Sequence, residues 1–221
     1  MSMIRRLAAS LLFLCLCLSV QAQFDVRVKN YIQDDLRKGA PFYDIGSVTR
    51  FVPSTMHMGL GLAGVPSRHA LLDRTVEATI AHACAISTGY ILKYAVKRER
   101  PDLSDNRSFP SGHTLFAFTG AELTRIEYGW GWGAGAYAVA AFTGGERLWG
   151  NCHWFTDVLA GAGIGFLSAH AGALLLDPVK RLLNLPESSW DGPWGRKASF
   201  ALAPAVDPFS GTYAATLALE F

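Results

Sequence analysis

The sequence carries very little net charge. Its 221 residues include 20 Lys and Arg against 18 Asp and Glu, so the formal net charge is only +2. A nearly neutral chain lacks the strong basic field that draws a protein to nucleic acid, and no DNA- or RNA-binding motif occurs in it. We therefore expect no nucleic-acid partner.

Charged residues of either sign are also scarce. They make up 17% of the chain, whereas hydrophobic residues make up 50%, and there are 22 glycines. This composition excludes an intrinsically disordered protein. It is typical of tightly packed helices, and the length suffices for one domain with a substantial core.

Cysteine is too rare for a disulfide framework. Cys15 and Cys17 fall in the apolar N-terminus, which leaves Cys84 and Cys152 for the rest of the chain. The two could pair in an oxidising compartment, but their spacing does not indicate that they meet. We expect buried free thiols.

The N-terminus has the pattern of an export signal. Arg5 and Arg6 precede an apolar run over residues 7–18, and Val20-Gln21-Ala22 is a suitable cleavage sequence. We expect a signal peptide over residues 1–22 and export to the periplasm. An uncleaved membrane anchor is the alternative.

Apolar periodicity divides the remainder into three parts. Residues 23–54 form a mixed polar segment with a short helix at 28–38, ended by Gly39-Ala40-Pro41. Residues 55–183 form an all-α helical bundle, and residues 184–221 form a linker followed by a short C-terminal β-hairpin. The predicted helices of the bundle lie at 55–63, 68–96, 114–128, 133–144 and 154–176.

The hairpin is predicted from a change of period. Phe200 and Leu202, and then alternate residues from Tyr213 to Phe221, are apolar, with a turn sequence at 208–211 between the two runs. A terminal Phe on such a strand also resembles the last strand of an outer-membrane barrel. Since two strands cannot close a barrel alone, we favour a packed hairpin.

The helical pattern leaves the relation to a membrane open. A membrane span needs about 20 apolar residues. Residues 158–176 come close, broken only by His170, whereas the run at 76–96 contains Glu77, His82 and Lys93. A buried soluble bundle and a bundle partly inserted in a membrane both fit this pattern.

Three motifs carry the functional information, and the first is basic. Lys93 lies near the end of an apolar helix, and Arg100 precedes Pro101. If the helix continued, the two cations would share one rim, where Lys supplies a point charge for phosphate and Arg a bidentate fork. A basic helix end explains them without any ligand, and we assign Lys97 and Arg98 to that structural role.

The second motif is Pro110-Ser111-Gly112-His113, at the start of an apolar helix. Backbone N–H groups at a helix start bind phosphate, the Ser111 hydroxyl is a further donor, and His113 could protonate a leaving alkoxide. A turn with an N-capping serine accounts for the same four residues without a function.

The third motif runs from Arg147 to Asp157. On a helix, His153 and Asp157 would share a face, so that the carboxylate fixes the imidazole tautomer and leaves one nitrogen free to attack phosphorus. Arg147 could neutralise the transferred group. A helix-start pair and a pair of metal ligands are the alternatives.

A metal fits this set poorly. Lys93, Arg100 and Arg147 would surround a cation with positive charge, whereas the same set suits an oxyanion. The remaining histidines have no partner at ligand spacing and are interpreted as structural; they are His57, His69, His82 and His170. A nucleophilic role for Cys152, next to His153, is disfavoured because neighbours on a helix point in different directions.

In order and spacing, the three motifs resemble the type 2 phosphatidic acid phosphatase and vanadium-dependent haloperoxidase superfamily. That family has Lys-x6-Arg-Pro, then Pro-Ser-Gly-His, then Ser-Arg-x5-His-x3-Asp, and the resemblance covers about residues 67–176. One position departs from the pattern: Glu146 stands where the family usually has Ser. We expect this change to affect rate and pH optimum.

The resemblance implies a helical bundle and a role for each matching residue. His153 would form a phosphohistidine, Asp157 would orient it, and His113 would protonate the leaving group and later activate water. The phosphate oxygens would be held by Lys93, Arg100, Ser111, the Gly112 backbone and Arg147. No metal and no cofactor are implied for phosphatase action.

We therefore expect a metal-independent phosphatase that hydrolyses a phosphate monoester or pyrophosphate, of a lipid in view of the apolar composition, at or in a membrane. Three alternatives stay open at this point. They are a non-specific acid phosphatase acting on soluble esters, a vanadium-dependent haloperoxidase, and a non-enzymatic membrane structural protein in which the hairpin matters most.

Overall fold

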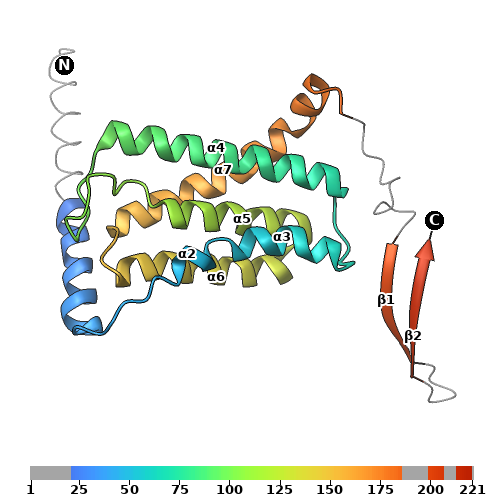
Figure 1. The fold of residues 1–221 in the computed structure, drawn as a ribbon, viewed down its shortest axis with the longest axis horizontal. Coiled ribbons are helices and arrows are strands. Elements are labelled where there is room, and N and C mark those ends of the chain that lie inside the picture. The colour runs from blue at the N-terminus through green and yellow to red at the C-terminus, as the bar shows by residue number, and fades with distance from the viewer. Residues whose placement is uncertain (1–20, 186–198, 207–212, 221) are drawn as a thin grey trace, which may run out of the picture.

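The computed structural model describes residues 21–185, 199–206 and 213–220, and it confirms the predicted helical bundle. Figure 1 shows the helices of the bundle lying side by side. The five main ones are α3 (Val52–Leu62), α4 (Leu71–Val96), α5 (Gly112–Tyr128), α6 (Trp130–Trp149) and α7 (Phe155–Leu182). The predicted signal peptide lies almost wholly outside the described residues.

Helix α5 is the centre of the bundle, packed against α3, α4, α6 and α7. Its buried face and those of its neighbours are built mainly from small residues, and many of the fully buried core side chains are alanines, among them Ala81, Ala117, Ala140 and Ala169. Small side chains allow helix axes to approach closely, as the Gly- and Ala-rich composition predicts.

The approach is closest between α5 and α7. A Cβ atom on Gly161 would lie 2.6 Å from the Ser111 carbonyl oxygen, and one on Gly165 would lie 2.5 Å from the Leu115 carbonyl oxygen. These glycines therefore set how deeply the first half of α7 sits against the start of α5, which is the end of the bundle that carries the second and third motifs.

Beside the motifs, the C-terminal end of α4 agrees with the sequence prediction, whereas the C-terminal end of α6 differs from it. Helix α4 stops at Val96, where Lys97 adopts a left-handed conformation with φ 49°, so the helix does not continue to Arg100. Helix α6 extends beyond the predicted 133–144 and includes Arg147 in its last turn. The connections at 97–111 and 150–154 then lie at the same end of the bundle (Figure 1).

The N-terminal segment packs against this same end. Residues 21–30 are helical and continue into the π-helix η1 (Tyr31–Arg37), which confirms a helix in the predicted region. Gln33 donates hydrogen bonds to the carbonyl oxygens of Leu148 and Trp149, at 3.1 and 3.2 Å. A short helix α2 (Gly46–Thr49) then leads into α3.

The predicted C-terminal hairpin is present as an antiparallel pair. Strand β1 (Ser199–Val206) pairs with β2 (Tyr213–Glu220), in a register that runs from Ser199 opposite Glu220 to Val206 opposite Tyr213. The predicted turn at 208–211 lies outside the described residues, as does Phe221.

One helix of the described part of the chain, α7, is long and apolar enough to cross a membrane by length and composition. This agrees with the prediction from residues 158–176. The core helix of a soluble protein passes the same test, so this feature alone does not choose between the two settings.

Candidate active site

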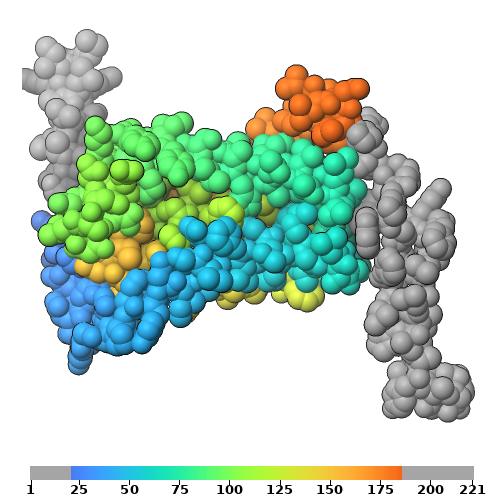
Figure 2. Space-filling model, in the orientation of Figure 1, coloured from blue at the N-terminus to red at the C-terminus, as the bar shows by residue number. Residues whose placement is uncertain are grey.

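A cavity of about 390 Å³ lies among α4, α5 and the connection between α2 and α3, at the end of the bundle where the motifs meet. Five of the eight predicted site residues line it: Lys93, Arg100, Gly112, His113 and His153. Figure 2 shows a hollow in the surface between α4 and the α2–α3 segment, with α5 visible between them. The residues around this one space, from Arg50 to His153, lie up to 103 positions apart in the sequence.

His153 and Asp157 are close, but not for the predicted reason. His153 precedes α7, which begins at Phe155, so the two do not share a helical face. Asp157 lies in the first turn, where its Oδ2 accepts a hydrogen bond of 2.9 Å from the Trp154 backbone N–H. That oxygen is 3.7 Å from His153 Nδ1. The carboxylate therefore faces one ring nitrogen and leaves Nε2 toward the cavity.

The free nitrogen of His153 lies beside a cation. Arg100 Nη1 is 3.3 Å from His153 Nε2 and also donates to the Cys152 carbonyl oxygen at 3.0 Å. Burial lowers the pKa of His153, the charge of Arg100 acts in the same direction, and Asp157 opposes both. The imidazole is accordingly neutral at neutral pH, the state that a nucleophile requires.

His113 lies on the other side of the cavity, as the second residue of α5. Its Nε2 is 3.4 Å from Arg50 Nη1. Burial, followed by the charges of Arg147 and Arg50, lowers the pKa of His113 to about 4. This histidine is therefore neutral at neutral pH, and a bound phosphate would raise its pKa by neutralising the surrounding cations.

Lys93 is held by the loop that carries the second motif. Its Nζ donates to the carbonyl oxygens of Arg107 and Pro110, at 2.8 and 2.7 Å. Burial, and then the charge of Arg100, lower the pKa of Lys93 to about 8. Lys93 and Arg100 thus share one rim although the helix between them has ended, because the loop folds back.

Three predicted residues are not on the cavity wall. Asp157 is fully buried behind His153. The Ser111 hydroxyl is also buried and lies 2.9 Å from Thr114 Oγ1, so it is turned away from the cavity. Arg147 is only 4% exposed and is paired with two carboxylates.

The partners of Arg147 include the residue that departs from the family pattern. Its Nε donates to Glu146 Oε2 at 2.6 Å, and its Nη2 contacts the carboxylates of both Glu146 and Asp44. Asp44 comes from the loop before α2 and is about half exposed, whereas Glu146 is buried. The charge of Arg147 is therefore balanced by acids unless an anion replaces one of them.

The sequence analysis missed a set of residues behind His153, and its interpretation of Arg98 as a plain helix-end cation was wrong. Arg98 donates to Asp157 Oδ1 at 2.8 Å and to Asp25 Oδ2 at 2.6 Å. Ser108 donates to Asp157 Oδ2 at 2.5 Å, and its Oγ is 3.4 Å from His153 Nδ1. Asp157 is thereby fixed from three sides.

Some of these residues left a trace in the sequence and others did not. Arg98 stands two positions before Arg100, so both can return to the same site once the chain turns after Val96. Asp25, 1% exposed, accepts hydrogen bonds from both the backbone and the hydroxyl of Thr156 as well as from Arg98. Nothing in its local sequence indicates a link to the third motif.

The remaining cysteines and histidines follow the predictions with one exception. Cys84 and Cys152 are free, as predicted, although half-buried rather than fully buried. Burial raises the pKa of Cys152, which keeps it a thiol and disfavours a nucleophilic role. The exception is His69, which the fold places against two carboxylates, whereas His170 faces only one, that of Glu122.

This arrangement defines a class of protein: a helical bundle with a cavity lined by cations, which carries two neutral histidines and a buried carboxylate behind one of them. The family model of the PAP2 superfamily matches residues 74–179. This match, over just under half of the chain, agrees with the resemblance of the three motifs.

Two further comparisons bear on the fold and the family. Over 93 residues the chain is 43% identical to a lipid A 1-phosphatase of Porphyromonas gingivalis, a match that covers 40% of this chain and 21% of that protein. The chain thus spans about a fifth of the length of this curated relative. The crystal structure of Aquifex aeolicus LpxE superposes with a TM-score of 0.52 at 20% identity, covering 70% of this chain and 95% of that one. That likeness supports the fold.

Proposed function

We propose that this protein is a metal-independent phosphatase that removes a phosphate group from a lipid through a phosphohistidine intermediate. The observation that carries the proposal is the cavity that joins His113, His153, Lys93 and Arg100. The match to the PAP2 family model and the likeness to a lipid A 1-phosphatase support it.

The proposed reaction has two steps, and both histidines take part in it. His153 Nε2 attacks phosphorus, while Asp157 stabilises the positive charge that develops on the ring through Nδ1. The bond between phosphorus and the leaving oxygen breaks, and His113 donates a proton to that oxygen. Water activated by His113 then hydrolyses the N–P bond and releases inorganic phosphate.

The cations supply most of the electrostatic stabilisation. Lys93 and Arg100 line the cavity beside His153, and Arg50 lines it beside His113, so they surround a bound phosphoryl group. Arg50 is therefore a phosphate ligand outside the three motifs. The Gly112 backbone lies at the start of α5, where a helix N-terminus favours an anion.

Arg147 and Ser111 require a rearrangement to take their proposed roles. A phosphate oxygen would replace the Asp44 carboxylate on Arg147, since Asp44 is the exposed member of its two partners. The Ser111 hydroxyl would exchange Thr114 for the phosphate. Binding of substrate thus competes with contacts that these two side chains make within the protein.

A lipid substrate is favoured by the apolar half of the cavity. Its apolar lining consists of Phe51, Ile86, Tyr90, Leu115 and Phe116. Phe51 also lines a neighbouring open groove of about 570 Å³ along α2 and α3, in which most side chains are apolar. An acyl chain leaving the cavity would have this groove as its path. Among lipid phosphates we favour a lipid A phosphate, because the relative from Porphyromonas gingivalis is a lipid A 1-phosphatase.

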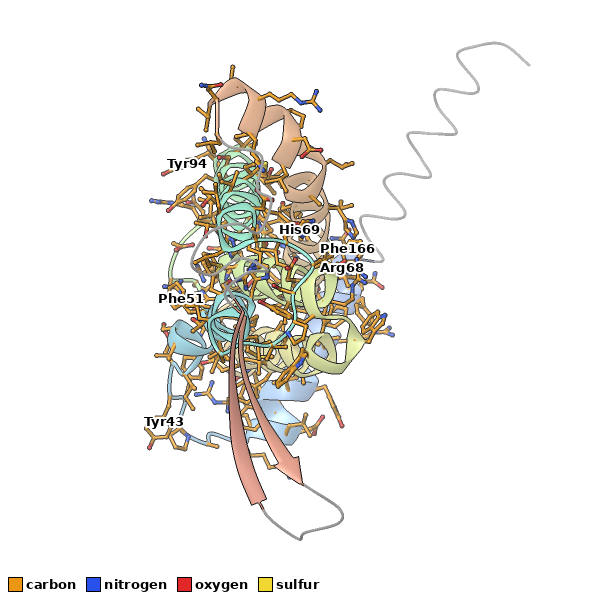
Figure 3. The ribbon with its side chains drawn as sticks, turned by 90° about the vertical axis from the view of Figure 1, so that its right-hand side faces the viewer. Tyr43, Phe51, Arg68, His69, Tyr94 and Phe166 are labelled. Atoms are coloured by element: carbon orange, nitrogen blue, oxygen red, sulfur yellow. The ribbon has the colours of Figure 1, made fainter. Side chains whose placement is uncertain are left out.

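We further propose that the protein is exported and acts at the periplasmic face of a membrane. A signal-like sequence at residues 1–22 and large exposed apolar side chains on α4 and α7 support this setting. Figure 3 labels two of these side chains, Tyr94 and Phe166.

Two variants and two substrates test the mechanism. p-Nitrophenyl phosphate has a good leaving group, whereas a lipid alcohol needs a proton to leave. With EDTA present, His153→Ala should lose turnover of both substrates. In kcat/KM, which reports the step that releases the alcohol and not the later hydrolysis of the N–P bond, His113→Ala should lose at least about 100-fold more with the lipid than with p-nitrophenyl phosphate. Full activity in His153→Ala, or equal losses for both substrates in His113→Ala, contradicts the mechanism.

A further inference from the structure

A second cluster of ionisable side chains lies at the end of the bundle opposite the phosphate cavity. Among the residues that the structure describes, His69, Glu77 and Glu127 bring one nitrogen and two carboxylate oxygens within 4.8 Å of one another. Glu77 precedes Lys93 on α4 by 16 positions, which corresponds to about 24 Å of helix. Figure 3 views this end of the molecule and labels His69.

Three segments contribute to the cluster. His69 lies in the connection between α3 and α4, Glu77 in the second turn of α4, and Glu127 in the last turn of α5. Both Glu side chains are buried, whereas the side chain of His69 is 38% exposed and gives solvent access to the group. Glu127 is held by His69, whose backbone N–H and Nδ1 lie 2.7 and 2.8 Å from its two oxygens.

Glu77 is the unexplained member. It is only 1% exposed, yet neither carboxylate oxygen has a hydrogen-bond partner among the described residues. Its Oε2 points into the cluster, 4.0 Å from His69 Nδ1. A buried carboxylate without hydrogen bonds is costly, and buried charges in native proteins are paired or coordinate metals.

The cations near Glu77 contact other groups. Lys180 lies 2.6 Å from Asp73, a turn before Glu77. Arg74 directs a guanidinium nitrogen to the Tyr128 hydroxyl. The nearby cations therefore have partners other than the Glu77 carboxylate.

We propose that His69, Glu77 and Glu127 form a binding site for a divalent transition-metal ion of the Zn²⁺ type. One imidazole and two carboxylates are a ligand set that zinc accepts, with a fourth position for water on the exposed side. Bonds of about 2.0–2.2 Å place tetrahedral ligands roughly 3.3 Å apart. The present separations of 2.8 and 4.0 Å at His69 Nδ1 bracket that value.

The ion would act as a clamp and not as part of the phosphatase reaction. It takes the place of the proton that now lies between His69 Nδ1 and Glu127 Oε2, and it adds Glu77 as a third ligand. The connection before α4 is then tied to both α4 and α5. This inference is independent of the proposed function, because the two sites share no residue.

The test uses the full protein, stripped with EDTA and titrated with Zn²⁺ alone. We expect one ion per chain, and a thermal midpoint that rises by about 5–10 °C at a hundredfold excess over Kd. Glu77→Gln, which keeps the shape of the side chain, should weaken Zn²⁺ binding at least about tenfold. His69→Ala should also weaken Zn²⁺ binding at least about tenfold. Because His69 lies in a connecting segment and is partly exposed, this variant tests the site even if Glu77→Gln fails to fold.

Two controls separate this site from other histidines. His170 pairs with Glu122 at 2.8 Å, away from the cluster, so His170→Ala should bind Zn²⁺ as the wild type does. His153→Ala should also retain it, which excludes the phosphate cavity as the binding site. If the wild type binds no zinc, or if Glu77→Gln binds it equally well, the proposal is wrong and Glu77 is a buried carboxylic acid.

Discussion

The individual side chains of the site differ in how their charges are balanced. Lys93, Arg100 and Arg50 line the cavity, and Arg100 forms a salt bridge of 2.8 Å with Asp105, whereas Arg147 is paired with the two carboxylates of Glu146 and Asp44. The departure from the family pattern at position 146 therefore has a physical consequence. It places a buried carboxylate on a cation that the phosphate would otherwise use.

Replacing Glu146 by the family residue should strengthen phosphate binding. In Glu146→Ser, Arg147 loses its buried partner and keeps only the exposed Asp44, so more of its charge is available to an anion. We expect inorganic phosphate to inhibit p-nitrophenyl phosphate turnover with a Ki lowered by about 3- to 10-fold. Asp177→Ser, which removes an acid from an exposed position of α7, serves as the control and should leave the Ki unchanged. Equal Ki values for Glu146→Ser and the wild type would show that Glu146 does not compete with phosphate.

The lowered pKa of Lys93 predicts the alkaline limit of activity. In the proposed mechanism its ammonium form holds the phosphate, and that form is present below the pKa of about 8 and lost as the pH rises through it. We expect kcat/KM to fall above about pH 8. Lys93→Arg keeps its charge at high pH, so the alkaline limb should move upward by at least about one pH unit even if the maximal rate drops. An unchanged limb in this variant contradicts the assignment.

Among the secondary-structure elements, the N-terminal helical segment takes part in building the site. Asp25 joins Arg98, in the loop after α4, to Thr156 at the start of α7. Arg98 in turn contacts Asp157. Three segments that are remote in the sequence thus meet behind His153.

Loss of Arg98 should affect the chemical step more than binding. Arg98→Gln removes a charged hydrogen bond to Asp157, so the carboxylate and the histidine before it are less firmly oriented. We expect kcat to fall by about 10- to 100-fold with KM changed less than about threefold. Lys97→Gln, at the exposed neighbouring position, should leave both parameters unchanged. A rise in KM with constant kcat would assign Arg98 to binding instead.

The contact between α5 and α7 depends on the absence of side chains. Gly165→Ala would force a Cβ atom to within 2.5 Å of the Leu115 carbonyl oxygen, so the helices must separate. We expect a loss of about 1–3 kcal/mol in the free energy of unfolding, measured by denaturant titration. Gly163→Ala, on the same helix with nothing within 4 Å, should be neutral or stabilising by up to about 1 kcal/mol.

For the molecule as a whole, the distribution of apolar side chains is the main feature. Large apolar residues are exposed on several helices, including Ile91 on α4 and Leu167 on α7, each 67% exposed. Charged groups of α4 and α5 are buried instead, among them Arg74, Glu77 and Glu122. Such a surface suits contact with lipid.

Exposed apolar residues should govern binding to membranes. Ile91→Ser combined with Leu167→Ser removes two large apolar contacts, each worth about 1.5–3 kcal/mol if fully buried in lipid. We expect partition into phospholipid vesicles to fall at least about tenfold in a flotation assay, with turnover of soluble p-nitrophenyl phosphate preserved. Thr75→Ala, on an exposed polar position of α4, is the matched control. Unchanged partition would place the membrane contact elsewhere.

Apolar periodicity and motif spacing were enough to predict the fold class, the approximate positions of the helices and most of the site. Periodicity locates helices because each must bury one face, and the motifs mark cations and histidines through their order and spacing. Five of the eight predicted site residues line the cavity for that reason. The end of α4 at Val96 was predicted, whereas α6 runs past the predicted 144 to Trp149, because Gly144 and Gly145 lie inside the helix and do not end it.

The partners of these residues became known only from the packed bundle. Asp25 and Asp157 are 132 positions apart and share Arg98, and His69 meets Glu127 from 58 positions away. Local patterns carry no information on such pairs, since they form where helices and connections converge after packing. The same convergence pairs Arg147 with Asp44 and leaves the buried carboxylate of Glu77 without a hydrogen bond among the described residues.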